Sequence, residues 1–115
     1  MTGDPRETAG TYFRSWKAKD FETLRSILAD DVTFAGPLGT ADDADACVRG
    51  IRGLSEIVTD IVVEKVWVDG PDVLTWFQLH TSVAPPCPVV NWSRVVAGRI
   101  ERIRVTFDPR PLTAS

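Results

Sequence analysis

Few side chains in this sequence could move a proton near neutral pH, and His80 is the first of them. It is the only histidine, and an imidazole with a reference pKa of about 6.5 suits a general acid or base. The surrounding pattern predicts a strand in which His80 shares a face with Trp76 and Gln78, while Phe77 and Leu79 take the other face. His80 therefore points either into a ligand pocket or toward an outer face and a subunit interface.

Two neutral hydrogen-bond donors form a second candidate group. Tyr12 carries a phenol with a pKa of about 10 and Asn91 a carboxamide, so both donate hydrogen bonds at neutral pH. Two donors that converge in a dry cavity can hold a carbonyl oxygen that is becoming an enolate. Alternatively, Tyr12 is an ordinary core residue of an amphipathic helix, and Asn91 satisfies a carbonyl at a strand edge. The sequence leaves both interpretations open.

Acidic residues and cysteines give weaker signals. Asp108 precedes Pro109 after the last predicted strand, where it is either a carboxylate at a cavity rim or an ordinary strand terminator. Three acids near the start of a predicted helix favour an interaction with the helix dipole over a metal site: Asp42, Asp43 and Asp45. With one histidine and two distant cysteines, no metal site, cofactor or disulfide framework is predicted.

The composition is that of an ordinary globular chain. The 115 residues, 43% of them hydrophobic and 25% charged, predict one domain over residues 1–115. The net charge of -3 argues against a nucleic-acid partner, which needs a basic face. No segment reaches membrane-spanning length, and the first ten residues lack an apolar signal region. These features predict a cytoplasmic protein without a membrane partner.

Helical periodicity dominates the first half of the chain. Three helices are predicted, with caps at Asp4, Asp20 and Thr40. The second ends at Ala29–Asp31 with Leu28 in its buried stripe, and a short strand, Val32–Phe34, follows it. Gly50 and Gly53 are expected to let the third helix pack closely against a sheet.

From Asp60 onward, alternating apolar residues predict a meander of long strands. Tight turns are predicted at Asp69–Asp72 and at Ala97–Gly98, and either a loop or a bulged strand entry at Ala84–Pro88. The order of helices followed by strands predicts an α+β fold. In this fold a cone-shaped, curved antiparallel sheet packs on three N-terminal helices and leaves one end hollow.

The sequence also resembles a known superfamily. The patterns AxxYFxxWxxxDFExLxxxLADDVxFxGPLG and GRIxRIRVxFDPRPL are similar to those of the nuclear transport factor two-like proteins, and the resemblance covers nearly the whole chain. Within that superfamily the chain is most similar to SnoaL-like polyketide cyclases and ketosteroid isomerase-like proteins. The resemblance implies a pocket for a small apolar molecule, such as a polycyclic ketone, and a homodimer formed through the sheet.

The resemblance also implies roles for particular residues. Tyr12 matches the tyrosine that donates a hydrogen bond to the developing enolate in steroid isomerases, and Asn91 stands where they keep a protonated aspartate. Gly36 stands where they keep the catalytic base. The implied activity is cofactor-free proton transfer of the isomerase or cyclase type, with His80 or Asp108 moving the proton. The alternative is a non-catalytic module that binds a hydrophobic ligand or serves dimerisation, which Gly36 supports.

Six residues are expected to contact the ligand: Trp16, Phe34, Leu54, Trp76, Gln78 and Phe107. Two further tryptophans, Trp67 and Trp92, are expected on the outer face of the sheet, where they would bury against a twin subunit.

Overall fold

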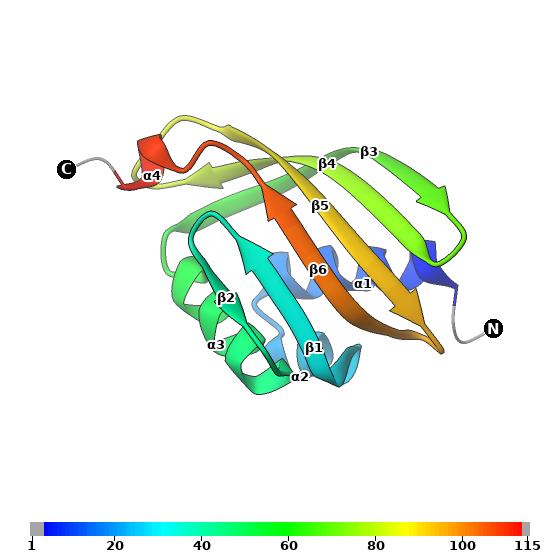
Figure 1. Ribbon diagram of the computed structural model, residues 1–115. Helices are drawn as coiled ribbons and strands as arrows, with labels where there is room; N and C mark the ends of the chain where they lie inside the picture. The colour runs from blue at the N-terminus through cyan, green and yellow to red at the C-terminus, as the bar shows by residue number, and fades with distance from the viewer. Residues whose placement is uncertain (1–3, 114–115) are drawn as a thin grey trace.

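The computed structural model describes residues 4–113 and shows helices packed under one strongly curved sheet (Figure 1). The helices are α1 (Pro5–Ala18), α2 (Phe21–Ser26), α3 (Ala44–Ser55) and α4 (Arg110–Thr113). The strands are β1 (Leu28–Gly36), β2 (Gly39–Ala41), β3 (Val58–Asp69), β4 (Asp72–Thr81), β5 (Cys87–Val96) and β6 (Arg99–Thr106). None of the helices within this range is long and apolar enough to cross a membrane.

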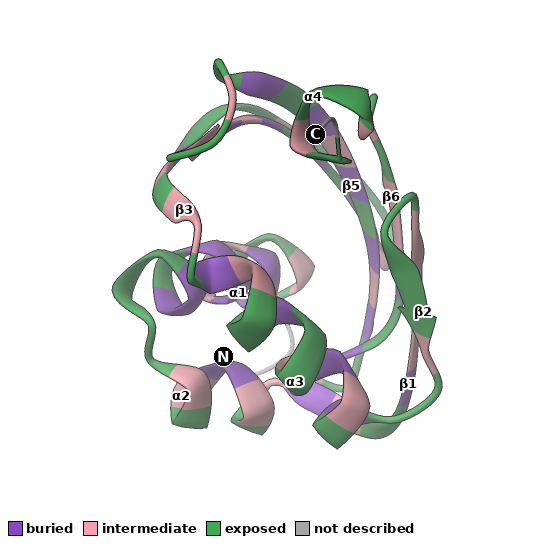
Figure 2. Cartoon of the chain, turned by 90° about the vertical axis from the view of Figure 1, so that its left-hand side faces the viewer, coloured by how far each residue is buried: buried purple, intermediate pink, exposed green. Residues whose placement is uncertain are grey.

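The sheet has the strand order β2-β1-β6-β5-β4-β3. Neighbouring strands are antiparallel except for β1 and β6, which run parallel. The α+β prediction is confirmed, but the sheet is mixed, and it bends over α1 and α3 without closing (Figure 2). The hairpin of β1 and β2 lies between α2 and α3 in the chain, and β1 joins the sheet beside β6, the last strand in sequence.

The second helix is shorter than predicted. It ends at Ser26, and Leu28 begins β1 instead of lying in the helix. Leu28 is fully buried and pairs with Ile100 of β6. Pairing with a distant strand thus overrides the local helical pattern over Ala29–Asp31.

The cap of the third helix also differs from the prediction. Thr40 lies in β2, where it pairs with Ala35. Asp43 is the residue that caps α3, since its carboxylate accepts a hydrogen bond of 2.7 Å from the backbone N–H of Ala46. Asp43 and Thr40 are both good cap residues, and the formation of β2 decides between them.

The turn at Ala97–Gly98 is confirmed, and it joins β5 to β6. Both residues have positive φ, 53° for Ala97 and 77° for Gly98, as a two-residue turn between right-twisted strands requires. Beyond the turn the register of β5 and β6 shifts by one residue. Val95 pairs with Ile100 and Arg94 pairs with Arg102, so Glu101 of β6 has no partner in the register. This bulge inserts one residue into β6 and accentuates the bend of the sheet.

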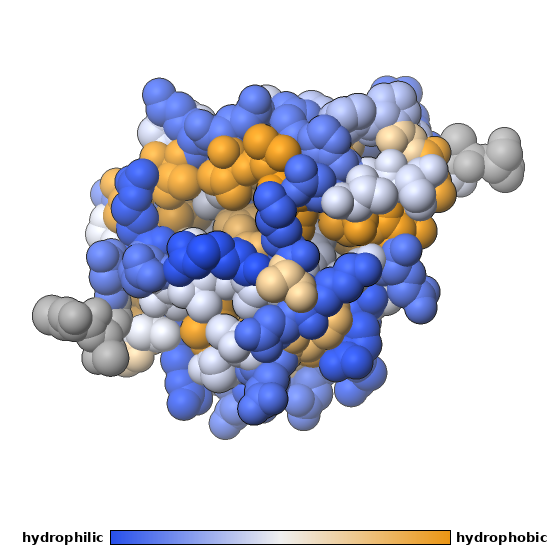
Figure 3. Space-filling model, turned by 180° about the vertical axis from the view of Figure 1, so that it is seen from behind, coloured by the Kyte–Doolittle hydropathy of each residue, from blue (hydrophilic) through white to orange (hydrophobic). Residues whose placement is uncertain are grey.

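The core lies between α1 and the concave face of the sheet. Its largest fully buried side chains include Tyr12, Leu24, Leu28, Phe77, Leu79, Ile100 and Ile103. On the surface, large exposed hydrophobic residues are frequent in β3, where they are Val62, Val63, Trp67 and Val68. Figure 3 shows hydrophobic residues gathered in its upper half, where β3 runs, and mainly hydrophilic residues around and below them.

Candidate functional site

A cavity of about 430 Å³ opens between α1, α3 and the concave face of the sheet. This volume lies within the range of small-molecule sites. The walls consist of α1, α3, β1, the turn into β2 and inward residues of β4, β5 and β6. The aromatic and large aliphatic lining residues are Tyr12, Trp16, Phe34, Leu38, Ile51, Leu54, Phe77, Leu79 and Phe107. An apolar ligand can therefore be enclosed without leaving many polar groups unpaired.

An aromatic cluster makes the inner wall of the cavity rigid. The ring of Trp16 lies edge-on to those of Tyr12 and Phe77, with centroids 6.1 and 6.0 Å away. The Trp16 indole N–H donates to Ser55 Oγ at 3.1 Å, and that hydroxyl donates to the carbonyl of Ile51 at 2.8 Å. The indole is thus fixed between α1 and α3, with its polar atom satisfied and its ring left for a ligand.

The structure brings Tyr12 and Asn91 together at the cavity wall. Both are buried, with 2% and 1% exposure, and both line the cavity. Ser93 Oγ donates to Asn91 Oδ1 at 2.8 Å, so the amide oxygen points to Ser93 and the NH₂ group is left for other partners. Asn91 acts as a hydrogen-bond partner that lowers the pKa of Tyr12, as expected for an amide N–H that donates to the phenol oxygen.

Tyr12 nevertheless stays protonated. Burial, and next the neighbouring Cys47, raise the pKa of Tyr12 well above its ordinary value of 10.0, and the hydrogen bond from Asn91 opposes this only in part. Burial also raises the pKa of the Cys47 thiol to about 11. At neutral pH the cavity wall therefore presents neutral donors.

Four of the six residues expected to contact a ligand line the cavity: Trp16, Phe34, Leu54 and Phe107. Trp76 and Gln78 do not line it. Their side chains lie on the outer face of β4, where both donate to Glu64 Oε1, at 3.0 and 2.9 Å. The apolar residues of β4, such as Phe77, take the inner face because the helices cover that side.

The sequence allows His80 to point into a pocket or toward the outer face, and in the structure it points toward the outer face. It follows Trp76 and Gln78 on the outer face of β4, and it is absent from the cavity lining. Its partner in the register is Asp60 of β3, whose carboxylate lies 2.9 Å from Lys17 Nζ. The position of His80 therefore gives no support to a role as proton carrier for a molecule in the cavity.

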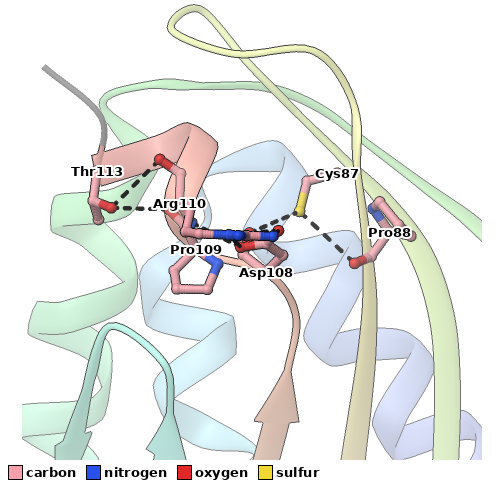
Figure 4. A network of polar contacts seen from close by, with 6 residues as sticks. All are labelled: Cys87, Pro88, Asp108, Pro109, Arg110 and Thr113. Atoms are coloured by element: carbon pink, nitrogen blue, oxygen red, sulfur yellow. Dashed lines mark hydrogen bonds and ion pairs between the residues drawn. The ribbon is translucent and has the colours of Figure 1, made fainter.

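Asp108 is likewise outside the cavity lining. Its carboxylate accepts hydrogen bonds from the backbone and guanidinium of Arg110, the shortest of them 2.7 Å long (Figure 4). These bonds lower the pKa of Asp108 to about 2. Such a carboxylate is a poor base, and its position fits a cap after the last strand.

Sequence reasoning named Leu54 of α3 but missed the other residues by which α3 lines the cavity. Gly50 and Gly53 line the cavity, and a Cβ atom at either would meet no atom within 4 Å. They keep cavity space open instead of allowing close packing against the sheet. Arg49 was missed as well, and it also lines the cavity. The spacing of Ala46, Gly50 and Gly53 along one helix face was the available signal.

Comparisons with known proteins agree with this architecture. The model of the SnoaL-like domain matches residues 9–103. The chain is similar to a solved protein from Kribbella flavida DSM 17836, with 29% identity, a TM-score of 0.87, and coverage of 92% of this chain and 88% of that one. No curated protein matches the chain.

Two further solved structures share the fold at lower identity. An NTF2-like protein of unknown function from Cytophaga hutchinsonii has 20% identity and a TM-score of 0.85, covering 97% of this chain and 96% of its own. An LEH-like epoxide hydrolase from M. tuberculosis has 20% identity and a TM-score of 0.78, covering 90% and 82%. The family match over most of the chain and these shared folds lead to one conclusion: the chain belongs to the SnoaL-like domain family.

Proposed function

We propose that this protein binds an apolar, carbonyl-bearing small molecule in the cavity between α1, α3 and the sheet. The observation that carries the proposal is the paired side chains of Tyr12 and Asn91 at a mostly apolar wall. Ser93 holds the amide oxygen of Asn91, and Asn91 lies beside the Tyr12 phenol, so the two side chains can present an N–H and an O–H donor to a ligand acceptor. A carbonyl oxygen is the matching acceptor on an apolar molecule, and the low dielectric of the cavity strengthens the bond.

Binding is favoured over catalysis because the cavity lining lacks a base. Within residues 4–113, it contains no aspartate, glutamate or histidine. The two candidate proton carriers, His80 and Asp108, lie elsewhere. A proton transfer next to a carbonyl needs a base within hydrogen-bond reach of that proton. The donors alone would polarise the carbonyl without removing the proton.

The test measures the affinity for 2-acetylnaphthalene, with 2-ethylnaphthalene as the control ligand that lacks the carbonyl. We expect Tyr12→Phe and Asn91→Leu each to weaken binding of the ketone about tenfold, since each removes one buried donor. Binding of the hydrocarbon should stay unchanged in both variants. A wild-type protein that does not bind the ketone, or that binds both ligands equally before and after substitution, would contradict the proposal.

The second candidate function is an isomerase- or cyclase-type proton transfer, which the same two donors favour. Gly36 lines the cavity, and an added Cβ would lie 3.4 Å from Phe34 Cε1 and Val105 Cβ, so a side chain requires only a small adjustment. We therefore expect Gly36→Asp to introduce the missing base, with Gly50→Asp as the control that places a carboxylate on α3.

The measurement for this second candidate is the conversion of a β,γ-unsaturated polycyclic ketone into its conjugated isomer, followed by ultraviolet absorbance. Turnover by Gly36→Asp and not by the wild type would mean that the wild type only binds the ketone. It would also mean that the cavity can support the reaction once a base is added. Turnover by the wild type that depends on Tyr12 would establish the enzyme instead.

The proposal also includes a homodimer that forms through the outer face of the sheet. Three tryptophans, Trp67, Trp76 and Trp92, are exposed there by 48%, 37% and 38%. The indole N–H of Trp92 is satisfied by Asp72 Oδ1 at 2.9 Å, so that ring can bury against a second copy without an unpaired donor. A cytoplasmic location and a single domain over residues 1–115 stay predictions.

A further inference from the structure

Arg49 is the only charged side chain that lines the cavity in the described part of the chain. It lies on α3 and is exposed, whereas Tyr12 and Asn91 are buried at 2% and 1% exposure. Arg49 also lines the shallow cleft between α2 and α3. Arg49 is thus placed at the rim of the cavity, where the cavity adjoins that cleft, and the neutral donors lie deeper.

No carboxylate neutralises Arg49 within residues 4–113. The acid one helical turn before it, Asp45, lies 3.0 Å from the Arg25 guanidinium, which also binds Asp30 at 3.0 Å. Asp45 is thus paired with Arg25, and no ion pair joins it to Arg49. Glu22 faces the same cleft, but no ion pair joins it to Arg49.

Arg52 is the other arginine in this region, and it differs from Arg49. Its guanidinium carbon lies 4.7 Å from the centroid of the Phe21 ring, and the side chain lines only the α2–α3 cleft. Arg52 therefore already has a partner and is directed away from the cavity. Arg49 is the arginine available to a molecule in the cavity.

We infer that the ligand of this cavity is an anion: an apolar body with its carbonyl at Tyr12 and Asn91 and a carboxylate at the rim beside Arg49. This inference rests on the proposed function and adds the charge of the ligand to it. A carboxylate could not enter the inner part of the cavity, because nothing there would compensate for its lost hydration. At the rim it stays partly hydrated and forms charge-assisted hydrogen bonds to the guanidinium.

The overall charge of the chain gives such a ligand no general attraction, so a local cation would aid its binding. The chain carries a net charge of -3, which disfavours the approach of an anion. A guanidinium at the rim provides local attraction and also selects one orientation of the ligand, with the carbonyl end inward. Arginine suits this role because its fork of donors matches a carboxylate.

The test compares 6-acetyl-2-naphthoic acid with its methyl ester, which differ in charge and share the acetyl carbonyl and the ring system. Affinities are measured by calorimetry for the wild type, Arg49→Gln and Arg52→Gln. The two variants lose the same charge from the same helix, so Arg52→Gln controls for long-range electrostatics. We expect Arg49→Gln to weaken binding of the acid about tenfold, as for loss of a hydrogen bond to a charged group.

We also expect the ester to bind the wild type and Arg49→Gln equally, and Arg52→Gln to bind the acid like the wild type. Added salt should weaken binding of the acid and leave the ester unaffected. Equal loss of acid affinity in both variants, or no loss in Arg49→Gln, would overturn the inference and leave the proposed function standing. Failure of both the acid and the ester to bind the wild type would remove the proposed function and this inference with it.

Discussion

The two faces of β5 have opposite environments although they belong to one strand. The inner face carries Val89, Asn91, Ser93 and Val95, all buried, and the outer face carries Val90, Trp92, Arg94 and Val96, which are half-buried or exposed. The inner set includes two polar side chains, whereas the outer set includes the largest apolar one. Residue hydrophobicity therefore does not by itself tell which face of this strand is the interior.

The contrast shows that polar groups face inward where they have partners. Ser93 donates to Asn91 Oδ1 at 2.8 Å, and Asn91 has Tyr12 as a further partner, so the burial of these polar groups costs little. Trp92 faces outward, where its N–H meets Asp72 and its ring lies 5.6 Å from the Arg102 guanidinium. The inner face thus has the chemistry of a ligand site, and the outer face that of an interface.

The largest expected effect is a difference in unfolding free energy between alanine variants of two adjacent residues of β4, one on each face. Phe77 is 1% exposed, and its ring lies 5.0 Å from that of Phe13, so Phe77→Ala should cost about 3–5 kcal/mol of unfolding free energy. Gln78→Ala removes one exposed hydrogen bond to Glu64 and should cost less than about 0.5 kcal/mol. Urea denaturation of both variants checks this; similar costs would contradict the assignment of the faces.

The next effect concerns the outer face. Trp92→Glu puts a charge into the proposed dimer interface and should weaken dimerisation more than about 30-fold, as for a central aromatic residue. Val83→Glu is the matched control, because Val83 is 55% exposed and lies in the loop after β4. Sedimentation velocity measures both variants. A monomeric wild type, or a Trp92→Glu variant that dimerises as before, would refute the homodimer.

A smaller effect tests the polar pair of the inner face. Ser93→Ala leaves Asn91 Oδ1 without its donor and should cost about 1–2 kcal/mol of stability. It also frees the amide to rotate, so affinity for 2-acetylnaphthalene should fall about fivefold. Ser15→Ala is the control, because Ser15 is also buried and donates to Thr11 O at 2.7 Å, away from the cavity lining. Equal ligand affinity in both variants would mean that Ser93 does not orient Asn91.

The smallest effect is a loss of stability at alkaline pH. The folded-state pKa of Cys47, about 11, is above its ordinary value of 9.0, so the folded state holds the proton more tightly than the unfolded state. The resulting stability is complete below pH 9 and is lost as the pH rises toward 11, by about 1 kcal/mol between pH 8 and pH 10.

Cys47→Ala should remove most of this loss, whereas Tyr12→Phe should change the profile only above pH 10, where a free phenol ionises. Part of the loss of stability at alkaline pH should remain in Cys47→Ala, because burial and Asp108 also raise the pKa of Cys87. Urea denaturation as a function of pH gives the profile. The same slope in Cys47→Ala as in the wild type would contradict this assignment.

Much of the fold could be predicted because its signals are local. The cap at Asp4, the stripe of Tyr12 and Trp16 and the turn at Ala97–Gly98 depend on neighbouring residues, and all agree with the structure. The errors occur where distant segments compete, as when pairing with β6 draws Leu28 into a strand. A pattern within one segment contains no information about the partner that lies beside it.

The candidate site was predictable only in part for the same reason. Tyr12 and Asn91 lie 79 positions apart in the sequence, and their proximity was expected from a family resemblance, not from their spacing. The direction of His80 could not be obtained from alternation, which defines two faces without saying which is covered by helices. Arg49 gave no signal, because an arginine on an exposed helix face is ordinary.

The amino-acid sequence by itself determined the types and order of the elements, since periodicity, caps and turns act over a few residues. Only the tertiary structure decided which face of the sheet is concave, because that depends on where the helices pack. The same packing places Tyr12 beside Asn91, leaves open space next to Gly50, and directs His80 outward. The packing of the helices on the sheet thus decides which residues line the cavity.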